Sequence, residues 1–282
     1  MSRDLDELEA NLYFALEPER RRLRSQLLDA LRQQQSKPLP MQGWVRIVDD
    51  QYTNMPLSSA GSLTGYGGRF NPGMDLDPGT LMPWPALYLA EDYETAYREK
   101  FQIKSSQTID GLKPEELALQ NGRSHSTVLL QGRIGRAFDM TVPRNLDAVA
   151  HVLKKIKMPD RAKGLKKKLR LKPTDVSMIQ SGQSLYNAVL MHNWRVQPAQ
   201  FGLPARSHVL AELVRAAGFE AILYRSTMGP GRCLAVFPDQ LSGQAYVELA
   251  DKAPPEVRHT RLDDNSAGDL AGWHILPSSF RR

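Results

Sequence analysis

The sequence contains a single cysteine, Cys233, among its 282 residues, so no internal disulfide framework can form. Its six histidines are scattered along the chain, and no group of cysteine and histidine has the spacing of a zinc site. We therefore expect no bound metal and a reducing compartment.

Long apolar runs are also missing. The first 22 residues, MSRDLDELEANLYFALEPERRR, are charged throughout and lack the apolar centre of a signal peptide, and no later run could span a bilayer. A hydrophobic content of 41% is sufficient for an ordinary buried core. We expect a soluble, cytoplasmic protein that makes no membrane contact.

Several familiar catalytic motifs are absent. The sequence has no GxxxxGK[ST] loop, no GxGxxG between a strand and a helix, no HExxH and no GxSxG. These absences argue against a P-loop nucleotidase, a dinucleotide-binding Rossmann domain, a zinc protease of that type and an α/β-hydrolase.

Positive charge is concentrated in one segment, KKIKMPDRAKGLKKKLRLK, residues 154–172. It holds ten of the 37 Lys and Arg residues and one acid, Asp160, which leaves 27 basic and 30 acidic residues elsewhere. Such a run is typical of a solvated helical face or a mobile excursion, and the alternative is a binding surface for an acidic partner. Direct nucleic-acid binding is not favoured, because the segment has no interleaved aromatics and no recognisable module.

The pattern of apolar residues predicts an α+β protein. Residues 4–35 have the spacing of one or two helices, and residues 43–102 form a first α/β block. The segments TVLLQGRI and AFDMTV are strand-like. In the segment SHVLAELVRAAG we expect a helix with Ser207 as its N-cap and Gly218 as its stop, followed by the strands AILYR and CLAVF.

Within this pattern several polar side chains occupy unusual positions. In WVRIV, alternation places Arg46 on one face of a strand with Trp44. Tyr88 lies on a short strand, on the face opposite Leu87. Asp92 is the expected N-cap of the next helix, on which Glu99 could point inward. Ser226 follows the strand AILYR and begins the glycine-rich turn STMGPG.

The stretch GYGGRFNPGMDLDPGT, residues 65–80, places Arg69 in a glycine-rich loop. Glycines such as Gly67 and Gly68 permit a positive φ or a close approach of backbone to a ligand, and an arginine can grip a phosphate with its forked donors. A plain surface loop, with Arg69 in an ordinary position, is the structural alternative. Asn71 and Pro72 are expected to shape the exit of the loop.

Taken in order, WVRIV, GGRFNP, ALYLAEDYETAYREKF and AGFEAILYRST...CLAVF resemble the RES domain of bacterial toxin–antitoxin systems. The resemblance covers residues 43–103 and 205–238 well and the region between them loosely. Phe70 stands where the family most often has tryptophan. The glycine and arginine motif, joined to Tyr88 and Glu99, is the specific part of the resemblance.

The resemblance implies an ADP-ribosyltransferase-like fold, a mixed β core with flanking helices, to which this chain adds an N-terminal helical extension. It implies a toxin-like enzyme that takes NAD as a substrate and inorganic phosphate as a co-substrate, releasing nicotinamide and ADP-ribose-1''-phosphate without a metal. The residues that match the family's motif are, as catalytic residues, Arg46, Glu99 and Ser226, and, as NAD-binding residues, Arg69, Tyr88, Gly68 and Asn71.

We therefore expect a helical extension at residues 1–38, a catalytic domain at 39–250 with a basic insertion near 151–173, and a C-terminal tail at 251–282. The expected partner is a cognate antitoxin or immunity protein, and a homodimer remains open. Two alternatives are kept: an ADP-ribosyltransferase that modifies a protein target, and a non-catalytic module that binds an acidic partner.

Overall fold

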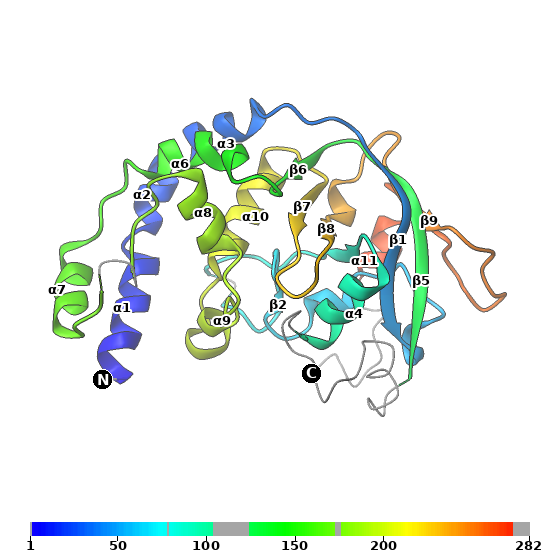
Figure 1. The fold of residues 1–282 in the computed structure, drawn as a ribbon, viewed down its shortest axis with the longest axis horizontal. Helices are drawn as coiled ribbons and strands as arrows, with labels where there is room; N and C mark the ends of the chain where they lie inside the picture. The colour runs from blue at the N-terminus through cyan, green and yellow to red at the C-terminus, as the bar shows by residue number, and fades with distance from the viewer. Residues whose placement is uncertain (1, 78, 104–123, 173–175, 273–282) are drawn as a thin grey trace. The chain divides into compact units, whose positions relative to one another are not determined.

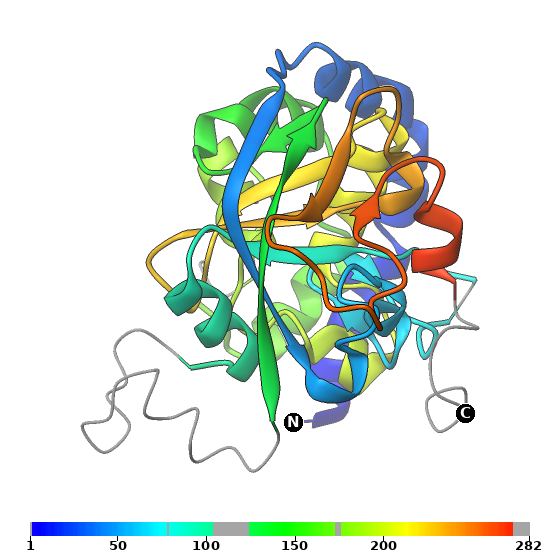
Figure 2. The same ribbon diagram turned by 90° about the vertical axis from the view of Figure 1, so that its right-hand side faces the viewer.

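The computed structural model describes residues 2–77, 79–103, 124–172 and 176–272 (Figures 1 and 2). The chain forms two compact units, each assembled from separate stretches of sequence. We call them the helical unit, which contains Met1–Gln35, Gly65–Pro83 and Val142–Ala217, and the sheet unit, which contains Ser36–Thr64, Trp84–Thr141 and Gly218–Arg282. The expected boundaries near residues 38 and 250 stay a prediction.

The described part of the sheet unit contains one eight-stranded sheet, in the order β10-β9-β5-β1-β4-β8-β7-β6. Neighbouring strands pair antiparallel except β6 and β7, which run parallel. This mixed sheet with flanking helices confirms the expected α+β class. The strands are β1 Leu39–Asp49, β4 Leu87–Ala90, β5 His125–Ile134, β6 Ala137–Asp139, β7 Ala221–Arg225, β8 Arg232–Val236, β9 Tyr246–Leu249 and β10 Arg261–Leu262.

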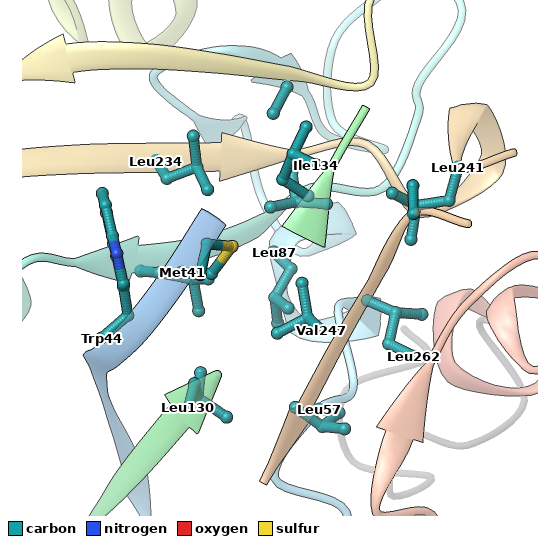
Figure 3. Packing of buried hydrophobic residues seen from close by; sticks show 14 of the residues in the cluster. Met41, Trp44, Leu57, Leu87, Leu130, Ile134, Leu234, Leu241, Val247 and Leu262 are labelled. Atoms are coloured by element: carbon teal, nitrogen blue, oxygen red, sulfur yellow. The ribbon is translucent and has the colours of Figure 1, made fainter. Parts of the chain in front are cut away.

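One face of the sheet carries the core of this unit (Figure 3). Because side chains alternate along a strand, the apolar residues at every second position of neighbouring strands meet on that face. Trp44 of β1 lies opposite Leu130 of β5, and Leu89 of β4 lies opposite Leu234 of β8. All four side chains are buried, so the predicted strands WVRIV, TVLLQGRI, Ala86 to Ala90 and CLAVF are confirmed.

The other face carries helix α4, Tyr93–Phe101. Its N-cap is Asp92, as expected, since the Asp92 carboxylate accepts a hydrogen bond of 2.7 Å from the Thr95 N–H. Gln102 ends the helix in a left-handed conformation, with φ at 59°. The short helix α11, Ala267–Ala271, packs on the core face instead, where Ala267 and Leu270 belong to the apolar cluster and the Leu270 carbonyl accepts a hydrogen bond from the Ser59 N–H.

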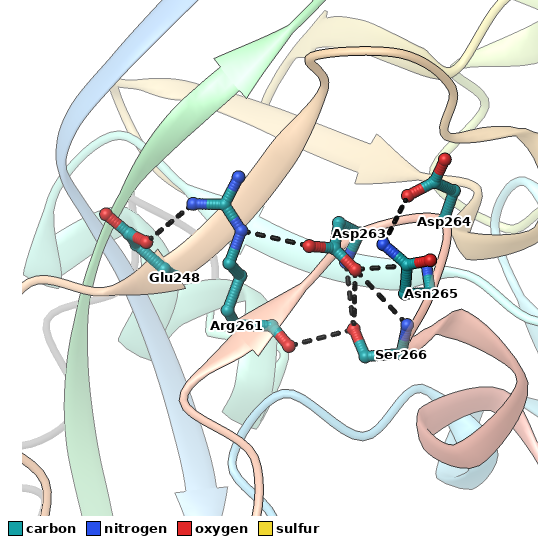
Figure 4. A network of polar contacts seen from close by, with 6 residues as sticks. All are labelled: Glu248, Arg261, Asp263, Asp264, Asn265 and Ser266. Atoms are coloured by element: carbon teal, nitrogen blue, oxygen red, sulfur yellow. Dashed lines mark hydrogen bonds and ion pairs between the residues drawn. The ribbon is translucent and has the colours of Figure 1, made fainter.

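The edge strand β10 and the turn after it are held by a polar network (Figure 4). The Arg261 guanidinium donates to Glu248 of β9 and to Asp263, both at 3.0 Å. Asp263 in turn accepts hydrogen bonds from the backbone N–H groups of Asn265 and Ser266. The expected C-terminal tail, 251–282, thus contains a strand and a helix up to residue 272, and its last ten residues lie outside the described part.

The helical unit contains short helices and a hairpin whose two strands have two residues each. The expected helical character of residues 4–35 is confirmed, but the chain forms three helices there instead of one or two. The elements are α1 Ser2–Phe14, α2 Glu17–Arg22, α3 Arg24–Arg32, β2 Gly67–Gly68, β3 Asn71–Pro72, α6 Asp147–Leu153, α7 Asp160–Lys168, α8 Gly182–Val189, α9 Val196–Phe201 and α10 Arg206–Ala216.

The basic segment forms α7, which packs against the acidic helix α1 (Figure 1). Leu8 of α1 and Leu165 of α7 belong to one apolar cluster. Around it, Lys168 pairs with Asp4 at 2.7 Å, and the Arg161 Nε donates to Glu7 at 2.7 Å. The positive charge on one side of α7 is therefore neutralised by acidic residues of α1. The charge count of the segment alone could not reveal this pairing, because the two helices are far apart in the sequence.

Helix α10 begins two residues earlier than the sequence suggested. Its N-cap is Ala205, and Ser207, the expected cap, lies buried in the first turn. At this start His208, the third helical residue, accepts a hydrogen bond of 3.3 Å at its Nδ1 from the Ala205 N–H, which is the half of a capping box that satisfies the N–H of the N-cap residue. Gly218 follows the helix with a positive φ of 85°, as expected of its stop.

Candidate functional site

Glu99 and Ser226 lie in direct contact in the sheet unit. The Ser226 Oγ donates to the Glu99 Oε1 at 2.6 Å, and the Thr227 N–H donates to the same oxygen at 3.1 Å. Glu99 is on the last turn of α4, and Ser226 directly follows β7. The structure thus joins two predicted site residues that are 127 positions apart.

The orientation of the Ser226 hydroxyl is determined by its surroundings. Its oxygen accepts hydrogen bonds from the backbone N–H groups of Met228 at 3.0 Å and Gly229 at 2.7 Å. With both acceptor positions used, the hydroxyl proton is directed at Glu99. Among the described residues the Glu99 Oε2 has no hydrogen-bond partner, so one carboxylate oxygen is held and the other can meet a substrate.

A buried threonine holds the turn that carries Ser226 against α4. The Thr95 Oγ1 accepts a hydrogen bond of 2.9 Å from the Gly231 N–H and donates to the Asp92 Oδ2 at 2.9 Å. A Cβ at Gly231 would lie 2.2 Å from the Asp92 Oδ2, and one at Gly229 would lie 2.8 Å from the Thr95 Cα. The glycines of the turn are therefore required by this close approach.

Tyr88 and Arg46 project from different faces of the sheet. Val45 of β1 lies opposite Ala90 of β4. Alternation therefore places Tyr88 on the face away from the apolar core, and Arg46 on the core face beside Leu89. Tyr88 is half-buried.

Arg46 is an arginine whose guanidinium is enclosed by protein. Its Nη2 donates to the Ser58 carbonyl at 2.7 Å, whereas its Nη1 is buried and has no hydrogen-bond partner among the described residues. The residue as a whole is only half-buried, so it is the head group that is shielded. This burial lowers the pKa of Arg46 to about 10, since the charged form loses its hydration.

Gly68, Arg69 and Asn71 belong to the helical unit, where they form the hairpin β2–β3. The Gly68 N–H donates to the Asn71 Oδ1 at 3.0 Å, across the turn. Gly67 has a φ of 86°, and a Cβ there would lie 2.2 Å from the Asn71 carbonyl oxygen. Gly67 is therefore needed for the hairpin itself, through its positive φ and the close approach of the facing strand.

Arg69, the arginine of this hairpin, is almost fully buried, with 6% of its surface exposed. Its Nη1 donates to the Met191 carbonyl at 2.9 Å, and its guanidinium carbon lies 5.8 Å from the centre of the Trp194 ring. It is thus not a plain surface residue, which was the structural alternative. Its expected contact with NAD stays a prediction.

His208 supports the same hairpin and was missed by sequence reasoning. Its Nε2 lies 2.8 Å from the Gly68 carbonyl, and its ring packs edge-on against Trp194. Burial lowers the pKa of His208 to about 4, against a smaller opposing effect of the Gly68 carbonyl. The ring is neutral at pH 7, with Nδ1 as acceptor and Nε2 as donor. No spacing signal marks this contact, because 140 positions separate the two residues.

Comparison with known families decides the assignment. The family description "RES domain" matches residues 44–262, more than three quarters of the chain. The chain belongs to the RES domain family. The match contains all seven predicted site residues, and the helices α1 to α3 precede it.

Two further comparisons are less informative than the RES match. No curated protein sequence matches this chain. Among solved structures, one chain of the crystal structure of the M. tuberculosis MbcT–MbcA toxin–antitoxin complex is similar, with 11% identity, 86% of this chain and 96% of that chain covered, and a TM-score of 0.43. A likeness at this level does not bear on the function of this RES protein.

Within the described ranges, no group of three or more His, Cys, Asp or Glu side chains is arranged to hold a metal ion. The same residues include no helix with the length and apolar character needed to cross a membrane.

Proposed function

We propose that this RES protein cleaves NAD at the bond between nicotinamide and ribose, as the toxin of a toxin–antitoxin system. The observation that carries the proposal is the Glu99 carboxylate, which receives hydrogen bonds from Ser226 and Thr227 on one oxygen and has no described partner on the other. A carboxylate oriented in this way is suited to stabilise a cation that forms beside it.

The chemistry of the reaction gives Glu99 its role. When the bond between the nicotinamide nitrogen and the ribose C1 breaks, the electron pair leaves with nicotinamide and positive charge develops on the ribose. A carboxylate placed next to the sugar stabilises this charge more strongly in the transition state than in the ground state. A hydrogen bond that a ribose hydroxyl donates to the Glu99 Oε2 would also orient the sugar.

Ser226 acts in this proposal by holding the carboxylate rather than by attacking the substrate. Its hydroxyl proton is directed at Glu99 and its lone pairs are engaged by Met228 and Gly229. The Glu99 oxygen that accepts this proton is also held by the Thr227 N–H, so the pair is arranged to fix the carboxylate. Tyr88, on the face of the sheet away from the core, offers an aromatic surface for the nicotinamide ring.

For the diphosphate of NAD we propose Arg46, because its buried Nη1 has no described partner. A buried N–H without a partner costs about 1–3 kcal/mol, more when it is charged, and an anion would relieve that cost. The register of β1 and β4 places Arg46 on the core face of the sheet, opposite to the face of Tyr88. Arg69 keeps the phosphate-binding role that the family resemblance implies.

Inorganic phosphate is the proposed acceptor, which would give ADP-ribose-1''-phosphate. Hydrolysis would give free ADP-ribose instead, and a protein acceptor would retain the ADP-ribose label. Incubation of the purified protein with NAD, with and without phosphate and with a bacterial protein extract, separates these three reactions by their products. A product that contains no phosphate even when phosphate is present would contradict phosphorolysis.

The proposed biological role is toxicity through loss of NAD, neutralised by a cognate antitoxin. Induced expression in bacteria should lower cellular NAD and stop growth, and Glu99→Gln should spare both, because it keeps the shape and removes the charge. Glu94→Gln is the matched control, since Glu94 is on the same helix and forms an ion pair with Arg98. Equal NAD loss with the Glu99 variant and the parent would refute the mechanism.

A further inference from the structure

The helical unit contains an apolar cavity of about 140 Å³ that is separate from the hairpin β2–β3. Its walls come from the end of α1, from α6, α8 and α10, and from residues 176–179. The lining is dominated by aliphatic side chains, among them Leu12, Leu153, Ile156, Leu185 and Leu213.

The size of this cavity restricts what it can hold. Sites for cofactors and drug-sized ligands have volumes of about 300–1,000 Å³. A cavity of about 150 Å³ accommodates a single benzene molecule. A volume of about 140 Å³ therefore suits one aromatic ring or one large aliphatic side chain, which is the size of an anchor residue at a protein interface.

The charges around the cavity indicate the character of the occupant. Two arginines, Arg20 and Arg206, line it, and no Asp or Glu does. Arg20 is engaged, because it pairs with Glu17 at 2.7 Å and lies over the Tyr13 ring. Arg206 forms no hydrogen bond or ion pair with any described residue, and an anion is the partner it lacks.

The position of Arg206 strengthens this preference. It is the first residue of α10, so its charge adds to the positive end of the helix dipole, where a cation is disfavoured and an anion is stabilised. Beyond the wall residues Leu153 and Ile156, the chain continues into the basic segment, whose Lys154 and Lys157 are exposed. These two lysines thus add positive charge next in the chain to wall residues of the cavity.

We propose that this cavity is a docking site for an acidic segment of a partner protein. The segment inserts one aromatic or large aliphatic side chain between α1, α6 and α8, and a carboxylate beside it pairs with Arg206. The basic residues that follow α6 extend the complementary charge and speed the encounter. This docking site is independent of the NAD reaction, so either proposal can fail without the other.

The test is a selection of random dodecapeptides displayed on phage against the full-length protein. Selected peptides should carry an aromatic, Leu or Ile residue beside Asp or Glu. Ala188→Leu, which adds bulk from α8 into the cavity, should weaken their binding by roughly tenfold or more. Arg206→Gln should weaken it by several-fold, with a reduced dependence on salt.

Matched controls separate the cavity from general effects on α8 or on charge. Ala199→Leu alters an exposed alanine of α9 outside the lining, and Arg144→Gln removes an exposed arginine from elsewhere in the same unit. Neither should change peptide binding. If Ala188→Leu does not fold, as judged by circular dichroism, Arg206→Glu at the half-exposed rim carries the test alone.

Three results would overturn the proposal. Selected peptides without an acidic bias would show that Arg206 does not bind a carboxylate of the partner. Equal binding of the peptides to Ala188→Leu and to the parent would show that they do not occupy the cavity. A failure to select peptides, together with saturable binding of benzoate or phenylacetate, would show a site for a small aromatic acid instead of a protein segment.

Discussion

The buried His208 makes the stability of the helical unit depend on pH. The folded protein holds this ring neutral with a pKa of about 4, whereas a histidine in an unfolded chain has a pKa of about 6.5. In the folded protein Nδ1 accepts a hydrogen bond from the Ala205 N–H. Protonation would put an N–H on Nδ1, so two donors would face each other. The folded state therefore resists protonation, and acid favours unfolding.

The sign and size of the effect follow from the two pKa values. Between pH 6.5 and about 4 the unfolded state binds more protons than the folded state. The contribution of His208 to the free energy of unfolding is therefore present above pH 6.5 and is lost as the pH falls toward 4. Each pKa unit corresponds to about 1.4 kcal/mol. The expected loss is about 0.8 kcal/mol at pH 6, about 2 kcal/mol at pH 5 and about 3 kcal/mol at pH 4.

Urea unfolding between pH 7 and pH 4.5 measures this loss. His208→Gln retains a side-chain N–H for the Gly68 carbonyl and cannot titrate, so the difference between parent and variant isolates this histidine from other groups. His151→Gln replaces an exposed histidine of α6 and should leave the pH dependence as it is in the parent. A parent and a His208 variant whose free energies of unfolding fall equally with pH would refute the reasoning.

Three further substitutions test the site. Thr95→Val removes the hydroxyl that accepts from Gly231 and donates to Asp92, so it should cost about 1–3 kcal/mol in urea unfolding and lower kcat for NAD; the exposed Thr127→Val should change neither. Arg46→Met should raise KM for NAD, because it removes the buried Nη1 donor that has no described partner; it also removes the Nη2 hydrogen bond to the Ser58 carbonyl, so the urea midpoint should fall, and a lower midpoint with KM unchanged would make Arg46 purely structural. Arg69→Lys should weaken turnover, since a lysine cannot reproduce the fork, and turnover equal to the parent would remove Arg69 from the proposal.

Local signals in the sequence predicted much of this fold. Alternation in WVRIV and the Asp92 cap depend on neighbours within a few residues, and β1 and α4 follow them closely. The same kind of signal was misleading at Ser207, because the competing group, His208, lies one residue further and acts through its side chain.

Contacts between distant segments could not be predicted in this way. The order of the motifs suggested that Glu99 and Ser226 act together, but only the fold shows that the serine donates to the carboxylate. The pairing of α7 with α1 and the contact of His208 with Gly68 likewise depend on tertiary packing. Arg46 and Tyr88 could be assigned to opposite faces of the sheet only from the register between β1 and β4.

The most direct measurement of the central claim is the release of nicotinamide from NAD by the purified full-length protein, followed by liquid chromatography in the presence of phosphate. The account predicts that the parent releases nicotinamide in many turnovers, that Glu94→Gln does the same, and that Glu99→Gln releases it at least a hundredfold more slowly, in keeping with the loss of one group that stabilises the transition state. NAD that remains intact with the folded parent protein, or nicotinamide release that is unchanged in Glu99→Gln, would contradict it.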